Sequence, residues 1–179
     1  MTDRDLIEAA REKCFILYEG KRTPHRSCGI ALAETFGLPS APYQSLRKGG
    51  LTGCGECGAI MAGRLLLGQF FGDPDPTGGV TPTLRAAMDD YEARWRQRVD
   101  RGDAPGESIV CNTLTGQFAE FRGLERARFC TNLATEVATV CAEVILAHGG
   151  TFEITPIPDL ADPCSSALSA PTSLRVDES

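Results

Sequence analysis

Apolar residues recur three and four positions apart along most of the chain, and clusters of Gly and Pro separate the segments that carry this pattern. Such spacing is typical of amphipathic helices. The first segment, residues 2–18, has Thr2 as its N-cap and Gly20 just past its end. Its apolar stripe consists of Leu6, Ala10, Cys14 and Leu17. We expect this helix to pack one face on a core.

Two Thr-Pro pairs mark further helix starts, because a capping residue followed by proline favours the first helical turn. Thr23-Pro24 predicts a helix that ends at Gly37, and Thr81-Pro82 predicts a mostly polar helix to about Arg101. We expect another helix from about Cys54 to Phe71, after a loop over 39–53, and a shorter one capped by Ser108. The longest helix, about 124–148, has one apolar stripe, formed by Cys130, Leu133, Val137, Cys141 and Val144.

No run of residues indicates strands, and no internal repeat is visible. The sequence therefore predicts an all-α fold, a single-domain bundle of five or six helices over residues 1–149. Residues 150–179 contain four prolines and a Ser/Ala stretch, which predict an extended, partly disordered tail. Alternating Phe152, Ile154 and Ile157 would lie along the domain surface.

The charge, hydropathy and cysteine content of the chain exclude some classes of function and favour others. The 179 residues carry a net charge of −6, so the basic footprint of a nucleic-acid or anionic-membrane binder is absent. The longest apolar stretch, residues 65–71, is too short for membrane insertion, and the charged N-terminus does not resemble a secretory signal. We expect a cytoplasmic protein, able to form a homodimer, with an unknown redox partner. Eight cysteines in such a chain indicate metal binding or redox chemistry rather than a disulfide scaffold.

The sharpest local motif is the pair Cys54 and Cys57, which is flanked by glycines at a predicted helix start. The N–H groups and the dipole of a helix start stabilise a thiolate, the form that reacts and binds metals. This pattern predicts Cys57 as the reactive, catalytic thiolate, with a lowered pKa, and Cys54 as its resolving partner. Glu56, between them, is a proton shuttle, a hard metal ligand or an exposed first-turn residue, and the last is the most common at such a position.

Three other cysteines, Cys28, Cys111 and Cys130, also lie near predicted helix starts. If these helix ends pack together, four or five sulfurs meet in one pocket. Cys28, Cys54, Cys57, Cys111 and Cys130 are therefore the candidate ligands of zinc or an iron–sulfur cluster. Cys14 and Cys141 are expected in the core, and Cys164 is expected to be a bystander in the tail.

Four short motifs occur in order along the chain: Cys28-Gly29-Ile30-Ala31, Cys57-Gly58-Ala59, Cys111-Asn112-Thr113-Leu114-Thr115-Gly116 and Phe129-Cys130. Their order resembles the C-GCAxxG-C-C family of small proteins, over about residues 28–146. The resemblance implies that Cys28, Cys57, Cys111 and Cys130 are the four family cysteines. It also implies redox activity rather than a purely structural metal. The chain departs from the pattern at Ala62, where a glycine is expected, and Cys54 is an addition.

Other candidate features favour structural interpretations. Residues 53–58 fit G-x-G-x-x-G, but no strand precedes them, so dinucleotide binding is discounted. His25 is a fourth metal ligand, a general acid near a thiolate, or an exposed residue of the first helical turn, and we favour the last of these. His148 suits the last turn of a helix. The arginines of residues 94–101 are balanced by carboxylates and indicate a solvated helix face.

Three functional hypotheses follow. The first is a cytosolic cysteine-based redox protein, with thiol/disulfide or cluster-based electron transfer, which would make it a thiol-based oxidoreductase. The second is a metal-binding module that holds zinc or an iron–sulfur cluster without catalysis. The third is a helical interaction domain whose cysteines only fill the core.

Overall fold

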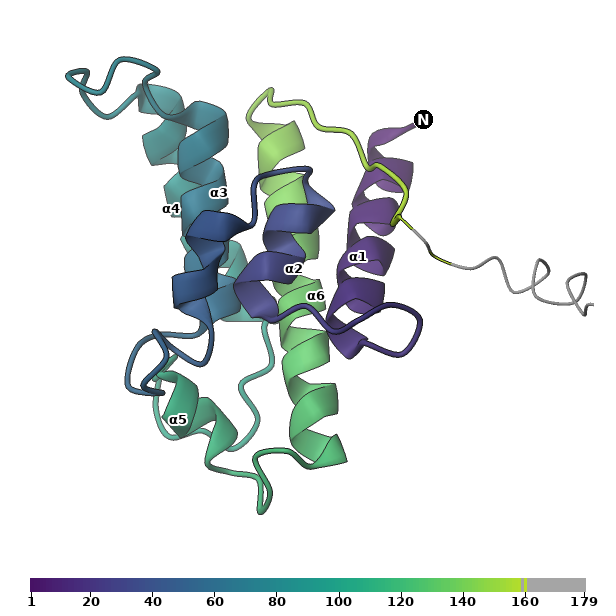
Figure 1. The fold of residues 1–179 in the computed structure, drawn as a ribbon. Helices are drawn as coiled ribbons and strands as arrows, with labels where there is room; N and C mark the ends of the chain where they lie inside the picture. Colours follow the sequence, from purple (N-terminus) through teal and green to yellow (C-terminus); the bar gives the residue numbers. More distant parts are fainter. Residues whose placement is uncertain (159, 161–179) are drawn as a thin grey trace, which may run out of the picture.

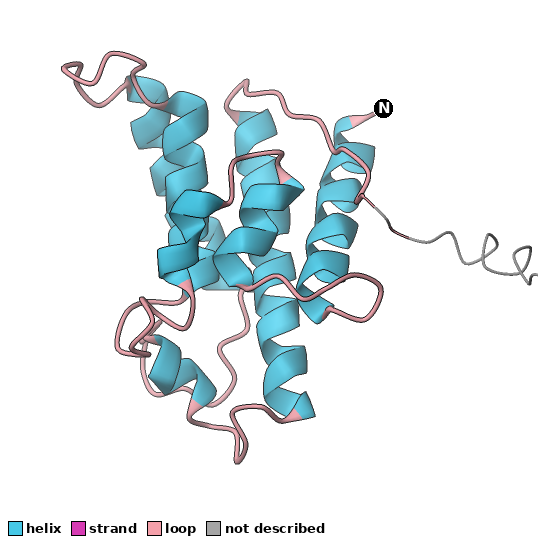
Figure 2. Ribbon diagram, viewed as in Figure 1, coloured by secondary structure: helices cyan, strands magenta, loops and turns pink. Residues whose placement is uncertain are grey.

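Six α-helices and one short 3-10 helix make up the part of the chain that this computed structural model describes, residues 1–158 and 160. They are α1 (Asp3–Glu19), α2 (Cys28–Thr35), η1 (Ala41–Leu46), α3 (Gly58–Phe71), α4 (Pro82–Arg98), α5 (Cys111–Thr115) and α6 (Leu124–Ala147) (Figure 1). No strand occurs among these residues (Figure 2). The prediction of an all-α, single-domain helical bundle is confirmed.

Helix α6 is the centre of the bundle and contacts α1, α2, α3 and α4 (Figure 1). Ala134, Ala138 and Ala142 are fully buried on it, and their small side chains let neighbouring helices approach closely. By length and composition alone, α6 is apolar enough to cross a membrane. However, 67% of its most apolar window is buried inside the protein. Its hydropathy is therefore explained by its place in the core.

The sequence signals at the ends of α1 are confirmed. Thr2 and Asp5 form a reciprocal capping box, and Gly20 ends the helix in the left-handed conformation with φ 73°. The end of α3 at Phe71 and the span of α6 also agree with the periodicity. In α4, the cap by Thr81 is confirmed, because its hydroxyl accepts a hydrogen bond from the Leu84 N–H.

The predicted start of the second helix at Thr23-Pro24 is wrong, because α2 begins only at Cys28. The Arg26 N–H donates a 2.8 Å hydrogen bond to the Leu17 carbonyl, which ties residues 21–27 back over the end of α1. This bond joins residues nine positions apart and holds Arg26 outside a helix. As a result, Cys28 is the first residue of its helix rather than part of its second turn.

The predicted helix start at Cys54 is also wrong, because α3 begins at Gly58 with Cys57 as its N-cap. Ser108 does not cap α5 either, since the N-cap is Val110. In both places the backbone is paired instead, through an isolated antiparallel bridge between Glu56 and Val110. The loop expected over 39–53 contains η1 as well.

The arginines of α4 do more than cover a solvated face. The expected i,i+4 pairs form, between Asp90 and Arg94 and between Glu92 and Arg96. In addition, both Arg94 and Arg98 pair with Glu143 of α6. This face of α4 therefore helps to join the two helices.

The start of the tail packs on the bundle, as the alternation of apolar residues predicted. Phe152 and Ile157 are buried, and the Phe152 ring meets Phe36 edge-on with centroids 5.1 Å apart. The Thr155 hydroxyl accepts a 3.1 Å hydrogen bond from Lys13 Nζ. The predicted disorder and Cys164 lie outside the described residues.

Candidate functional site

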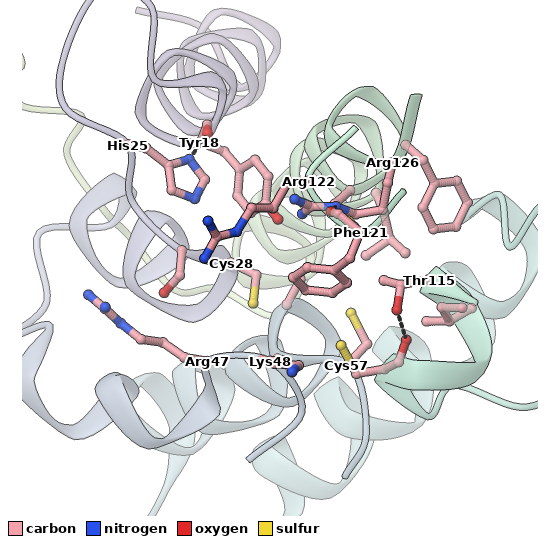
Figure 3. A pocket seen from close by; sticks show the side chains of 18 residues that line it. Tyr18, His25, Cys28, Arg47, Lys48, Cys57, Thr115, Phe121, Arg122 and Arg126 are labelled. Carbon is pink, nitrogen blue, oxygen red and sulfur yellow. Dashed lines mark hydrogen bonds between the residues drawn. The ribbon is translucent and has the colours of Figure 1, made fainter. Parts of the chain in front are cut away.

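Four cysteines from four separate elements line one cavity of about 530 Å³ (Figure 3). Cys28 is the first residue of α2, Cys57 is the N-cap of α3, Cys111 is the first residue of α5, and Cys130 lies in the second turn of α6. Residues 102 positions apart along the chain thus meet at one place. The predicted gathering of helix starts around these four thiols is confirmed.

Backbone hydrogen bonds set Cys57 and Cys111 beside each other. The Cys57 N–H donates to the Ile109 carbonyl at 2.7 Å, and the Cys111 N–H donates to the Gly55 carbonyl at 2.9 Å. Asn112 extends this pairing with a 2.8 Å bond to the Gly53 carbonyl. Because alternate residues of paired strands share a face, Cys57 and Cys111 lie on the same side of the short pairing.

The loop before this pairing has an unusual backbone. Lys48, Gly49, Gly50 and Leu51 all have positive φ, between 48° and 70°. Four such residues in a row form a left-handed turn, closed by a 2.7 Å hydrogen bond from the Leu51 N–H to the Arg47 carbonyl. Lys48 and Leu51 have side chains and are strained in this conformation. Lys48 lines the cavity, so the strain lies at the candidate site.

Glycine is required at position 58, the first residue of α3. A Cβ there would lie 2.3 Å from the Leu46 carbonyl oxygen and 2.7 Å from Cys28 Sγ. Gly58 therefore lets the Cys28 sulfur lie against the start of α3. This close approach is a physical reason for the Cys-Gly-Ala sequence at residues 57–59.

The structure does not bring Cys54 to this cavity. Its side chain is exposed, and its N–H donates to the Thr52 hydroxyl within its own turn. Its predicted places as resolving partner of Cys57 and as a fifth ligand do not fit this geometry. The core positions predicted for Cys14 and Cys141 are confirmed, since both are fully buried.

Burial keeps the cavity thiols protonated at neutral pH. It raises the pKa of Cys28 to about 11, from the ordinary value of 9.0. Burial likewise raises the pKa of Cys57 far above that value, although the N–H groups of Ala59 and Ile60 act in the opposite direction. The prediction that a helix start lowers the pKa of Cys57 is therefore wrong, because desolvation outweighs the helix terminus.

Cations face the two other thiols. Burial raises the pKa of Cys130, while the Arg126 guanidinium and the Tyr18 hydroxyl lower it. The pKa of Cys111 is also raised by burial, and Arg126 and Lys48 act against that rise. Cys130 and Cys111 are thus the cavity thiols whose thiolate forms have positive charges beside them.

Four basic side chains line the cavity: Arg47, Lys48, Arg122 and Arg126. Figure 3 shows Arg47 and Lys48 on one side of the cavity and Arg122 and Arg126 on the other. The Phe121 ring lies between the two groups, with Lys48 Nζ 5.3 Å and Arg126 Cζ 4.6 Å from its centroid. These four cations were not predicted from the sequence. Basic residues before and within the first turn of a helix, as at 122 and 126, oppose the helix dipole and were the available signal.

The remaining candidate residues have structural partners. His25 is exposed, as favoured, although it lies at the cavity beside the Tyr18 ring and carbonyl. Glu56 pairs with Arg64, which also pairs with Glu92, and its side chain does not line the cavity. His148 follows α6 directly, where it contacts Asp90.

The described residues do not form a metal site as they stand. No three His, Cys, Asp or Glu side chains among residues 1–158 and 160 lie close enough to hold one ion. The predicted set of five cysteine ligands also loses Cys54, which is exposed outside the cavity. A cavity of about 530 Å³ fits a small molecule, for which pockets of about 300–1,000 Å³ are usual.

Comparison of the chain with protein-family models, with curated proteins and with solved structures finds no match. The resemblance to the C-GCAxxG-C-C family therefore stays a prediction. The dinucleotide motif gains no support from the fold, because no strand precedes residues 53–58 in the described part of the chain.

Proposed function

We propose that this protein is a thiol-based oxidoreductase that exchanges electrons with a small disulfide or thiol substrate inside the cavity. One observation carries the proposal: four cysteines from four elements converge on one small-molecule-sized cavity. Core filling accounts for Cys14 and Cys141, which are fully buried elsewhere. It does not account for thiols that line an accessible cavity.

The chemistry that fits this cavity is thiol–disulfide exchange. The Cys130 thiolate attacks one sulfur of a substrate disulfide and forms a mixed disulfide, and one substrate thiolate leaves. A second cavity thiol then attacks the Cys130 sulfur, and the other substrate thiolate leaves. The protein loses two electrons, the substrate gains them, and the two protein thiol protons end on the two product thiols. The reverse sequence oxidises a substrate thiol pair.

Cys130 takes the attacking role because attack requires a thiolate. Arg126 and the Tyr18 hydroxyl both lower the pKa of Cys130, against the larger effect of its burial. Cys57, the thiolate predicted from the sequence, has no cation among the causes that shift its pKa. We assign Cys57 to the second step, in which its proton passes to the departing substrate thiolate as its sulfur attacks the mixed disulfide.

The test is reversible oxidation of the fully reduced protein by 2-hydroxyethyl disulfide. We expect cavity thiols to be lost in pairs and restored by dithiothreitol. Peptide mass spectrometry should place the new disulfide between cavity cysteines. Cys130→Ser should abolish pairwise oxidation, and Cys57→Ser should trap a mixed disulfide at Cys130 if Cys57 is the second thiol.

Cys54→Ser is the matched control, because this cysteine belongs to the same loop but is exposed outside the cavity. It should oxidise at the wild-type rate. A disulfide that always includes Cys54, or pairwise oxidation in Cys130→Ser at the wild-type rate, would contradict the proposal. Iron or zinc bound stoichiometrically to anaerobically purified protein, and lost from Cys130→Ser, would favour the metal-binding module instead.

A further inference from the structure

The four basic side chains of the cavity have no carboxylate partner among the described residues. No ion pair involves Arg47, Lys48, Arg122 or Arg126 in residues 1–158 and 160, whereas seven other Lys and Arg side chains pair with Asp or Glu: Arg11, Lys21, Arg26, Arg64, Arg94, Arg96 and Arg98. No Asp or Glu of this part of the chain lines the cavity either.

The positive charge of the cavity is opposite in sign to the net charge of the chain as a whole, which is −6. Acidic side chains outnumber basic ones, 24 to 18, and yet the cavity lining contains four basic residues and no acidic ones. Because burial keeps the four thiols neutral, they do not offset this charge. The reduced cavity is therefore a cationic pocket in an acidic protein, and such a pocket concentrates anions.

We propose that the substrate of this cavity is a small disulfide or thiol that carries carboxylate or phosphate groups. This assignment rests on the proposed redox function and names its substrate class. Arg47 and Arg122 hold the acidic groups at the two sides of the cavity, since a guanidinium donates paired hydrogen bonds to carboxylates and phosphates. The substrate sulfur lies further in, within reach of Cys130.

The remaining side chains of the cavity suit the apolar part of such a substrate. The Phe121 ring is 44% exposed and lies beside Lys48 and Arg126, so it offers an apolar surface between the two charged sides. Leu114 and Leu133 line the interior. A molecule with a short aliphatic or aromatic body and charged ends matches this order of polar and apolar surfaces.

Three disulfides with the same CH2CH2–S–S–CH2CH2 core test the charge preference: 3,3′-dithiodipropionate, which is dianionic, 2-hydroxyethyl disulfide, which is neutral, and cystamine, which is dicationic. The measured quantity is the rate constant for oxidation of the reduced protein at low salt. We expect the dianion to react about tenfold or more faster than the neutral compound, and the dication slowest. Sodium chloride at 0.15 M should narrow these differences, because the Debye length falls to about 8 Å.

Arg122→Gln and Arg47→Gln should slow the reaction of the dianion several-fold more than that of the neutral disulfide. The ratio of the two rates therefore measures the contribution of each arginine to recognition of the anion. Arg85→Gln is the matched control, because it removes the same charge from an exposed position on α4 that is outside the cavity. It should leave all three rates at their wild-type values.

Binding of suberate separates the substrate assignment from the redox proposal. Suberate has the chain length and the two carboxylates of 3,3′-dithiodipropionate but no sulfur, so it reports only recognition of the anion. Calorimetry should show binding to the wild type that weakens in Arg122→Gln, and no binding of 1,8-octanediol.

The outcomes are distinct. No suberate binding, together with equal rates for the three disulfides, overturns the anionic substrate and leaves the redox proposal standing on the neutral disulfide. Suberate binding without reversible oxidation by any disulfide overturns the proposed function, and the substrate assignment with it. Faster reaction of the dianion that Arg122→Gln and Arg47→Gln do not diminish overturns the placement of the acidic groups.

Discussion

Gly58→Ala tests whether the close approach of Cys28 to the start of α3 shapes the cavity. The new Cβ would lie 2.3 Å from the Leu46 carbonyl oxygen and 2.7 Å from Cys28 Sγ. Ordinary van der Waals contacts of a Cβ begin at 3.4 Å, so the carbonyl must retreat by about 1 Å. This oxygen belongs to the backbone at the end of η1 and has no rotamer that would move it away. Overpacking of this kind costs about 1–3 kcal/mol.

Gly68→Ala is the control, because it makes the same change in the same helix where no atom lies within 4 Å of the new Cβ. It should stabilise the protein by about 0.5–1 kcal/mol, since alanine loses less backbone entropy than glycine in a helix. Urea unfolding followed by circular dichroism measures both free energies. At a cost of about 2 kcal/mol, Gly58→Ala should lower the Tm by about 4–8 °C.

The same variant has a second readout in the cavity. Displacement of Cys28 should change its alkylation rate in the folded protein, whereas Gly68→Ala should leave that rate unaltered. Equal unfolding free energies for Gly58→Ala and the wild type, with unchanged alkylation of Cys28, would refute the reasoning that glycine is required at this position.

Two further predictions concern the strained loop and the buried thiols. Lys48→Gly and Leu51→Gly should each stabilise the protein by about 1 kcal/mol, because glycine adopts a positive φ without strain, and urea unfolding can check this. Only Lys48→Gly should weaken the preference for dianionic disulfides, because Lys48 lines the cavity, and the series of oxidation rates can check that. Burial raises the pKa of Cys14 to about 12, so the folded state keeps a proton that the unfolded state releases above pH 9, and stability must fall as pH rises from 9 to 12. The loss is about 1.4 kcal/mol per pH unit for this thiol, and a denaturant series with Cys14→Ala should show a correspondingly shallower fall.

The helix bounds that were predicted correctly rest on local signals. Thr2 and Thr81 cap their helices through hydrogen bonds within a few residues, and Gly20 ends α1 in the left-handed conformation, so the sequence alone reveals these bounds. The starts of α2 and α3 were predicted wrongly. Their observed positions depend on hydrogen bonds to residues outside the helix, from Arg26 to Leu17 and from Cys57 to Ile109. Such bonds exist only once the fold has formed, and no local pattern encodes them.

The predictions for the cysteines also separate into those that rest on local signals and those that depend on the whole fold. Four that lie at or near helix starts, Cys28, Cys57, Cys111 and Cys130, were predicted to gather, and they line one cavity. Cys54 was grouped with Cys57 because two residues three positions apart at a helix start share one face of the helix. The helix begins after both residues, so the spacing does not place them together. The pKa of Cys57 was mispredicted because burial depends on the packing of the whole bundle.

The net charge of the cavity depends on whether its thiols are protonated. Binding of an anionic substrate is therefore linked to the ionisation of the same thiols that would react with it. At neutral pH the thiols are uncharged, so the positive charges of Arg47, Lys48, Arg122 and Arg126 attract an anion without opposition. Above about pH 11, ionisation of Cys28 would begin to offset those charges. A disulfide between Cys130 and Cys57 leaves Cys28 as a thiol, so this ionisation occurs in the reduced and in the oxidised protein alike. Anion binding should therefore weaken above about pH 11 in both forms, and a suberate titration of each form at rising pH can measure the loss.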